Sequence, residues 1–160
     1  MNFPDKESVE RIRREYPAGC RIVLDGMEDP YTKIPIGTQG TVKGVDDTAS
    51  VMPAWDCGSN LSVVYGVDSY HKIRTEEEAL KTINWYGKHQ PEENARCPRC
   101  GEMMMGSKNR HALSRYADII VCDQCGMIES LEKAGLMEAL PLMKWCCIET
   151  SQNGDGAWRG

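Results

Sequence analysis

Hydrophobic and polar positions at the start of the chain form one amphipathic segment. Val9, Ile12 and Tyr16 recur at a helical spacing with charged residues between them, so residues 4–16 are predicted to form a helix. Pro17 ends this helix, because proline cannot continue its backbone hydrogen bonds. Beyond this point the helical period is lost.

Residues 20–73 contain short apolar runs separated by turn residues, a pattern that is typical of small β-structures. Gly58 lies between two of these runs, where a tight hairpin needs a residue with positive φ. Five short strands with a long first loop over residues 25–36 predict a small SH3-like barrel, and an OB-type barrel is the alternative. The predicted strands are residues 20–24, 40–45, 50–55, 61–64 and 70–73.

The pattern returns to a helical one after the last of these runs. Thr75 and Glu78 form a capping box that begins a helix over residues 75–87. The following stretch, residues 88–95, is polar and broken by Pro91, which favours a linker that acts as a hinge. Residues 129–139 again permit a helix.

Eight cysteines occur in a chain without a predicted signal peptide or an apolar run long enough to cross a bilayer. We therefore expect a cytoplasmic protein that does not enter a membrane. Reducing cytosol disfavours a disulfide framework, so the cysteines point to a metal, with zinc as the first candidate.

Four cysteines form two Cys-x-x-Cys pairs separated by 21 residues, and a glycine follows each pair directly. Two intervening residues let both sulfurs of a tight turn face one ion, and the glycine lets the backbone approach the thiolates. Four thiolates close the tetrahedron around zinc, so the predicted single Zn²⁺ is structural. Its ligands are Cys97, Cys100, Cys122 and Cys125.

Disulfides or unrelated core cysteines are the alternative for these pairs. A thioredoxin-like redox motif is disfavoured because neither pair lies in a βαβ pattern. Cys146 and Cys147 are adjacent and are expected to pack in the interior, because adjacent cysteines form only a strained disulfide. An additional metal or redox pair is the other interpretation of these two residues.

The formal net charge of −5 argues against a protein that coats nucleic acid through bulk electrostatics. The segment between the two cysteine pairs is nevertheless locally basic. Such a segment can contact phosphate and stack on a base, although a solvated hairpin tip or a protein-docking element has the same composition. The candidate residues for contact with nucleic acid or a partner are Arg99, Lys108, Asn109, Arg110, His111, Arg115 and Tyr116.

No sequence motif of a major enzyme class is present: there is no P-loop, no Gly-x-Ser-x-Gly, no zinc-protease helix and no deaminase signature. Cys20 or Cys57 with one of the three histidines is a weaker, enzymatic alternative. We therefore expect a protein that binds and does not catalyse.

The segment from Gly37 to Asp46 (GTQGTVKGVD), with Trp55–Ser59 and Gly66–Asp68, resembles a family of uncharacterised barrel domains of bacteriophages and mobile elements. The segment 109–122 (NRHALSRYADIIVC), with Cys125-Gly126 and Pro141-Leu142, resembles a second uncharacterised segment from the same setting. Together they cover residues 16–145. The resemblance implies a bacterial host cell and carries no activity.

Two positions depart from the first of these families. Cys57 stands where its turn usually has asparagine. Pro53 removes a ladder hydrogen bond, so its strand is expected at a sheet edge or at a bulge. Trp55 beside it is expected either on a binding face or in the core.

These patterns predict a mainly β fold with flanking helices, in which a small SH3-like barrel precedes a helix, a linker and a zinc ribbon. The expected function is that of a nucleic-acid-associated adaptor of a phage or mobile element. The alternative is an inhibitor of a host nucleic-acid-binding protein such as a defence nuclease, in the manner of an anti-CRISPR protein. The sequence predicts no oligomeric state. The predicted segments are an N-terminal helix (1–18), a barrel (19–74), a helix (75–87), a linker (88–95), a zinc ribbon with a C-terminal helix (96–148) and a flexible tail (149–160).

Overall fold

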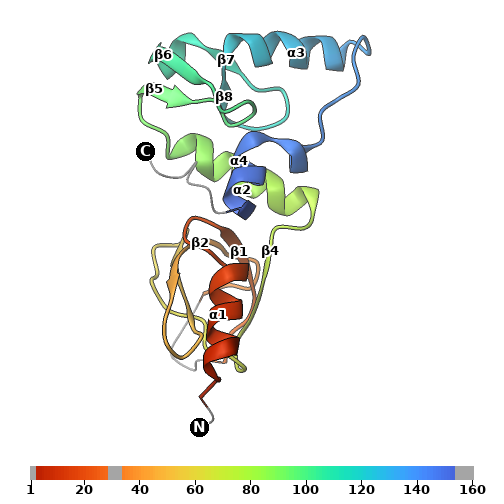
Figure 1. Ribbon diagram of the computed structural model, residues 1–160. Coiled ribbons are helices and arrows are strands. Elements are labelled where there is room, and N and C mark those ends of the chain that lie inside the picture. The colour runs from red at the N-terminus through yellow and green to blue at the C-terminus, as the bar shows by residue number, and fades with distance from the viewer. Residues whose placement is uncertain (1–2, 29–33, 154–160) are drawn as a thin grey trace. The chain divides into compact units, whose positions relative to one another are not determined.

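The computed structural model describes residues 3–28 and 34–153, and helix α1 (Lys6–Glu15) is its first element (Figure 1). Asp5 caps this helix, because its carboxylate accepts a hydrogen bond of 2.8 Å from the backbone N–H of Ser8. Val9 and Ile12 are the buried residues of the helix. The predicted helix and its apolar face are confirmed.

Four antiparallel strands follow helix α1 and form one sheet in the order β3-β2-β1-β4. Pro53 lies on the edge strand β3, opposite Val42, and the pairing register shifts between Val42 and Gly44. The expectation that proline occupies an edge or a bulge is therefore confirmed. The strands are β1 (Arg21–Gly26), β2 (Gln39–Val45), β3 (Val51–Trp55) and β4 (Ser69–Lys72).

The fifth strand predicted for this sheet is reduced to a single bridge between Val51 and Val63. The chain turns immediately after it, because the Asp68 carboxylate accepts from the Val64 N–H at 2.8 Å and the Val64 carbonyl accepts from the N–H groups of Val67 and Asp68. Within the described residues the sheet is open, and it does not close into a barrel.

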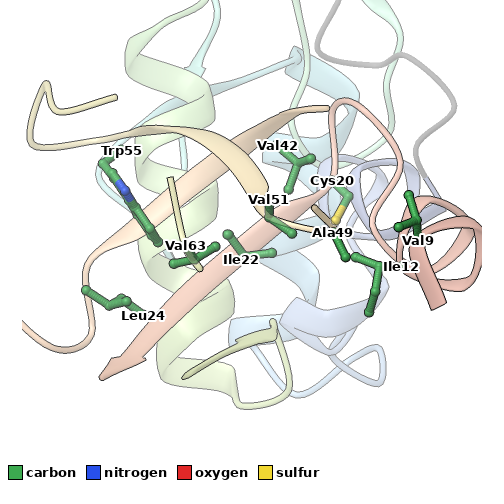
Figure 2. Close-up of a cluster of buried hydrophobic side chains, with 10 residues drawn as sticks. All are labelled: Val9, Ile12, Cys20, Ile22, Leu24, Val42, Ala49, Val51, Trp55 and Val63. Atoms are coloured by element: carbon green, nitrogen blue, oxygen red, sulfur yellow. The ribbon is translucent and has the colours of Figure 1, made fainter. Parts of the chain in front are cut away.

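The core of this sheet collects side chains from α1 and from three of the strands (Figure 2). Trp55 belongs to it, since this residue is 3% exposed and its indole N–H donates to the Leu61 carbonyl at 2.8 Å. Gly40 faces this ring, and a Cβ there would lie 2.8 Å from it. Trp55 is therefore a core residue, and it does not form a binding face.

The second half of the described chain begins with helix α2 (Glu76–Lys88), which is capped by the Thr75 hydroxyl as predicted. Two small antiparallel hairpins, two α-helices and two short 3₁₀ turns follow it among the described residues. These elements are β5 (Glu93–Arg96) with β6 (Met103–Ser107), the 3₁₀ turn η1 (Lys108–Arg110), β7 (Ala112–Leu113) with β8 (Ile120–Val121), α3 (Asp123–Lys133), the 3₁₀ turn η2 (Leu142–Lys144) and α4 (Cys146–Asn153).

Three boundaries differ from the prediction. The expected linker over residues 88–95 contains most of β5, because Glu93 and Ala95 pair with β6. The helix expected over residues 129–139 begins earlier and ends at Lys133, where it is followed by Gly135 with a positive φ of 79°. Helix α4 continues through the start of the predicted tail, and residues 154–160 lie outside the described residues.

The chain divides into two units: the first extends to Ile73, and the second comprises residues 74–149. The described residues 150–153, at the end of α4, group with the first unit. The first division lies beside residue 74, where the predicted barrel segment ends. Helix α2 and residues 88–95, for which a hinge is predicted, both lie within the unit that contains the four clustered cysteines. The mainly β prediction is confirmed at the level of small antiparallel sheets with a few helices. None of the described helices is long and apolar enough to cross a membrane.

Candidate metal centre

The first cysteine pair lies in the turn that joins β5 to β6. The Gly101 N–H donates to the Cys97 carbonyl and the Cys97 N–H donates to the Glu102 carbonyl, both at 2.8 Å, so the chain forms a tight knuckle. Gly101 has a φ of 80°, a conformation that side chains with a Cβ rarely adopt. The backbone conformation at this position therefore requires the glycine that follows the first cysteine pair.

The second pair begins helix α3. Cys122 is the N-cap of this helix, and its sulfur accepts from the Cys125 N–H at 3.4 Å. Gly126 allows the helix to approach β7, because a Cβ there would lie 2.4 Å from the Ala112 Cβ. The second pair therefore lies in the first turn of a helix, and not in the kind of tight turn that holds the first pair.

The four cysteine sulfurs of Cys97, Cys100, Cys122 and Cys125 lie within 4.8 Å of one another. The Cys100 and Cys122 sulfurs are 3.7 Å apart. A zinc–sulfur bond of about 2.3 Å gives a tetrahedron with edges of about 3.8 Å, whereas a disulfide has an S–S distance of about 2.05 Å. The four cysteines are free, and their spacing fits a tetrahedral zinc ion.

The electrostatics of the cluster favour negative sulfur at Cys97. Its pKa is lowered to about 5, first by a hydrogen bond from the Cys125 thiol and then by backbone N–H groups, among them that of Cys122 at 3.3 Å. The same hydrogen bond raises the pKa of Cys125, which acts as the donor. A divalent cation would replace the protons of the thiols and hold four thiolates together, in a centre with a formal charge of −2.

A buried ionic network joins the knuckle to α3. The Arg99 guanidinium lies 2.6 Å from the Glu132 carboxylate and 3.3 Å from the Glu129 carboxylate. All three side chains are at most 4% exposed. The guanidinium also lies over the rings of Tyr116 and Trp145, at 5.9 Å and 5.6 Å from their centroids.

Both carboxylates also accept hydrogen bonds from other groups of the second unit. Glu129 accepts from the Ser114 hydroxyl at 3.1 Å and from the Arg115 N–H at 2.6 Å. Glu132 accepts from the Leu140 N–H at 2.8 Å, and the hydrogen bond from Arg99 is the main cause that lowers its pKa. The network thus ties four chain segments together beside the cysteine cluster.

Sequence reasoning missed this network, although one signal for it was present. Cys125, Glu129 and Glu132 are spaced i, i+4 and i+7 and therefore share a helix face. A face that carries a zinc ligand points inward, so the two carboxylates on it required a buried cation. Arg99, between the two cysteines of the knuckle, is that cation.

The residues predicted to contact nucleic acid or a partner differ in their burial and in their hydrogen bonds. Arg99 is buried in the ionic network, so the prediction that it touches phosphate is wrong. Tyr116 donates its hydroxyl to Glu132 at 3.2 Å, and the His111 Nε2 donates to the Met105 carbonyl at 3.0 Å. These three side chains stabilise the unit itself.

The remaining candidates differ in exposure. Lys108 is 14% exposed and donates to the Gln90 carbonyl at 3.2 Å, while Arg115 is exposed and donates to the Gly126 carbonyl at 3.1 Å. Asn109 and Arg110 are exposed on turn η1, and in residues 3–28 and 34–153 their side chains show no hydrogen bond or ion pair.

Cys20 is not arranged as an activated nucleophile. Cys20 is fully buried, and burial raises its pKa to about 11, which is opposite to the shift of an activated thiol. Cys57 is exposed. His71 pairs with the Asp25 carboxylate at 2.7 Å, and His89 stacks on Trp85.

Cys146 and Cys147 begin helix α4 against the knuckle. Their backbone N–H groups donate to the carbonyls of Arg99 and Pro98 at 3.0 and 3.1 Å. Cys147 is buried, as predicted, whereas Cys146 is only partly buried and lies beside Gly101. Their position supports the turn that carries the first two sulfurs.

Comparison with known proteins bears on the first unit. No curated protein and no solved structure matches the chain. The model of a family described as "Domain of unknown function (DUF4314)" matches residues 5–73. The matched segment comprises α1 and the four-stranded sheet, so the first unit is similar to this family, whose description names no activity.

Proposed function

We propose that this chain is a non-enzymatic, zinc-stabilised binding protein that associates with nucleic acid. The observation that carries the proposal is the convergence of four cysteine sulfurs within 4.8 Å. Four thiolates leave zinc no open position for water or substrate, so the ion would act as a structural cross-link. Binding would then occur on the surface that this cross-link holds.

The surface that we assign to nucleic acid lies on the segment 103–117. This segment contains Lys108, Arg110 and Arg115 and has no acidic residue. Arg110 and Asn109 project from a short 3₁₀ turn between two hairpins, each of which leads to a cysteine pair. Exposed arginine and asparagine are suited to contacts with phosphate and with base edges.

Replacing Arg110 with Ala is expected to weaken binding to a single-stranded oligonucleotide by about three- to tenfold. The change removes one phosphate contact, so the slope of log K against log salt should fall by about 0.7. Fluorescence anisotropy of a labelled oligonucleotide at several salt concentrations measures both quantities.

The matched control is Arg11→Ala, which removes an exposed arginine from α1 with the same change of charge. Its affinity and salt slope should equal those of the unaltered protein. A wild-type protein that binds neither RNA nor DNA would exclude the proposed association, as would an Arg110→Ala protein that matches the Arg11→Ala control.

A second candidate is a protein partner, for example a host nucleic-acid-binding protein that this chain inhibits. Four large apolar side chains of the second unit are strongly exposed, and such side chains would form a protein-docking surface where they adjoin one another. They are Met105 (70%), Leu113 (63%), Met127 (68%) and Leu136 (73%). In this case Met127→Lys should abolish capture of the partner from a bacterial lysate, whereas Arg110→Ala should retain it.

The cellular setting and the finer fold of the first unit are also part of the proposal. The resemblance to uncharacterised segments of phages and mobile elements supports an accessory role in a bacterial host. An open four-stranded sheet with an additional bridge at Val63 is compatible with an incomplete SH3-like barrel. The burial and raised pKa of Cys20 support a role without catalysis.

A further inference from the structure

Three cationic residues from three separate elements line one hollow of the second unit, and the guanidinium of one of them, Arg96, also donates to the Gly101 carbonyl at 3.2 Å. Lys88 comes from the end of α2, Arg96 from β5 and Lys108 from turn η1. The hollow has a volume of about 170 Å³. This volume is several times the roughly 30 Å³ that one water occupies in the liquid, so a tetrahedral anion would fit.

The floor of the hollow is apolar and rigid. Ala95, Met104 and Ile119 line it and are at most 5% exposed. Gly87 packs directly against this floor, because a Cβ at its position would lie 2.4 Å from the Ile119 side chain. An apolar floor below cationic groups resembles the sites that hold a phosphate group while a sugar or base lies against carbon.

The cations are only weakly neutralised by the protein. Lys88 lies 3.8 Å from Asp118 and Lys108 lies 3.6 Å from Glu92, and these two carboxylates are 85% and 73% exposed. Ion pairs of this length with solvated partners contribute little. Asp118 also lines the hollow, so the balance there is three cationic side chains against one solvated carboxylate.

Lys108 is held in position before any ligand arrives. Its ammonium donates to the Gln90 carbonyl at 3.2 Å, and its side chain is 14% exposed. An ammonium group has three N–H donors, so this contact leaves donors for an anion. A cation fixed in this way loses little side-chain entropy on binding.

We propose that this hollow binds one phosphate group through Lys88, Arg96 and Lys108. The inference deepens the proposed association with nucleic acid and rests on it for the biological source of the phosphate. The group would be either a phosphodiester of a single strand or a free phosphate. Arg96 directly precedes the zinc ligand Cys97, so the metal would also keep one of the three cations in place.

The test uses the full-length, zinc-loaded chain with two probes, inorganic phosphate and a labelled single-stranded oligonucleotide. Lys88→Gln is the main variant, because Lys88 is 59% exposed and its neutralisation leaves the fold intact. Lys108→Gln is the second variant. Lys6→Gln, at the exposed start of α1, is the matched control with the same change of charge.

Lys88→Gln is expected to weaken binding of at least one probe by about three- to tenfold relative to Lys6→Gln, and to lower the oligonucleotide salt slope by about 0.7. Loss confined to the oligonucleotide identifies a phosphodiester as the source. Loss of phosphate binding in a protein that binds no oligonucleotide identifies free phosphate, which would support the hollow and overturn the proposed function.

Two results would overturn the hollow as a phosphate site. In the first, Lys88→Gln and Lys108→Gln bind both probes as tightly as the control does. If Arg110→Ala still weakens oligonucleotide binding, the proposed function is then retained and only the hollow is excluded. In the second, the wild-type protein binds neither probe, and both proposals then fail.

Discussion

Replacing Cys97 with Ser is expected to release the zinc ion and to unfold the cysteine-containing unit, residues 74–149. Cys97 is 1% exposed, and it belongs to the knuckle that pairs β5 with β6. Structural zinc contributes on the order of 10 kcal/mol of apparent binding free energy, which is comparable with the entire stability of about 5–15 kcal/mol of a typical domain. The remaining core of so small a unit cannot replace it.

Two measurements check this expectation. Metal analysis should find about one zinc per wild-type chain and a lower content in Cys97→Ser. Residue-resolved hydrogen exchange should show loss of protection in β5, β6 and α3, while β1 and β2 of the first unit retain theirs.

The control for this experiment is Cys57→Ser. Cys57 is an exposed cysteine of the first unit and lies outside the cluster of four sulfurs. This variant should keep both the zinc content and the exchange pattern of the wild type. A Cys97→Ser protein that retains stoichiometric zinc, or a wild-type protein whose exchange pattern is unchanged by a strong chelator, would contradict a structural zinc site.

Replacing Arg99 with Met is expected to destabilise the second unit by about 3–5 kcal/mol. The change leaves the carboxylates of Glu129 and Glu132 buried without their cation, and such charges cost far more than the pair contributes when it is complete. Urea unfolding of the zinc-loaded protein, monitored by the protection of α3, measures the loss. Arg110→Met, which neutralises an exposed arginine of the same unit, is the control.

The same change should alter the dependence of stability on pH. Arg99 holds the pKa of Glu132 below its ordinary value of 4.5, so their pairing stabilises the fold above that pH and is lost as the pH falls through the lowered pKa. The difference in stability between wild type and Arg99→Met should therefore narrow in acid. A constant difference would contradict this role.

A second variant separates an unpaired charge from lost packing. Combining Arg99→Met with Glu129→Gln and Glu132→Gln removes all three charges and should recover much of the lost stability. A triple variant that is as unstable as Arg99→Met alone would show that the packing of the guanidinium on the Tyr116 and Trp145 rings matters more than its charge.

The four clustered cysteines could be predicted from sequence because their signal is local: a two-residue spacing and a glycine after each pair. The shape of the second pair could not be predicted in the same way. A Cys-x-x-Cys sequence is compatible with a β-turn knuckle and with the first turn of a helix. The choice is made by Gly126 and Ala112, whose contact brings α3 against β7.

The burial of Arg99 was not predicted, and the reason is different. Its partners Glu129 and Glu132 lie 30 and 33 residues further along the chain, so no local pattern connects them to Arg99, although their helix face marks the two carboxylates as buried. In the first unit, alternating apolar runs predicted most of the strands. The strand expected at residues 61–64 was shortened by Asp68, whose side chain caps the backbone of Val64 and turns the chain away from the sheet.

The division between Ile73 and Arg74 has an evolutionary consequence. Each strand pair and each of the four clustered cysteines lies wholly on one side of it, and the DUF4314 match ends at the same position. A recombination event at this point would join two genes without separating a hydrogen-bonded strand from its partner or a ligand from its ion. We expect the two halves to have independent ancestries, and genome surveys with each half as a separate query should find them on different chains and beside different companions.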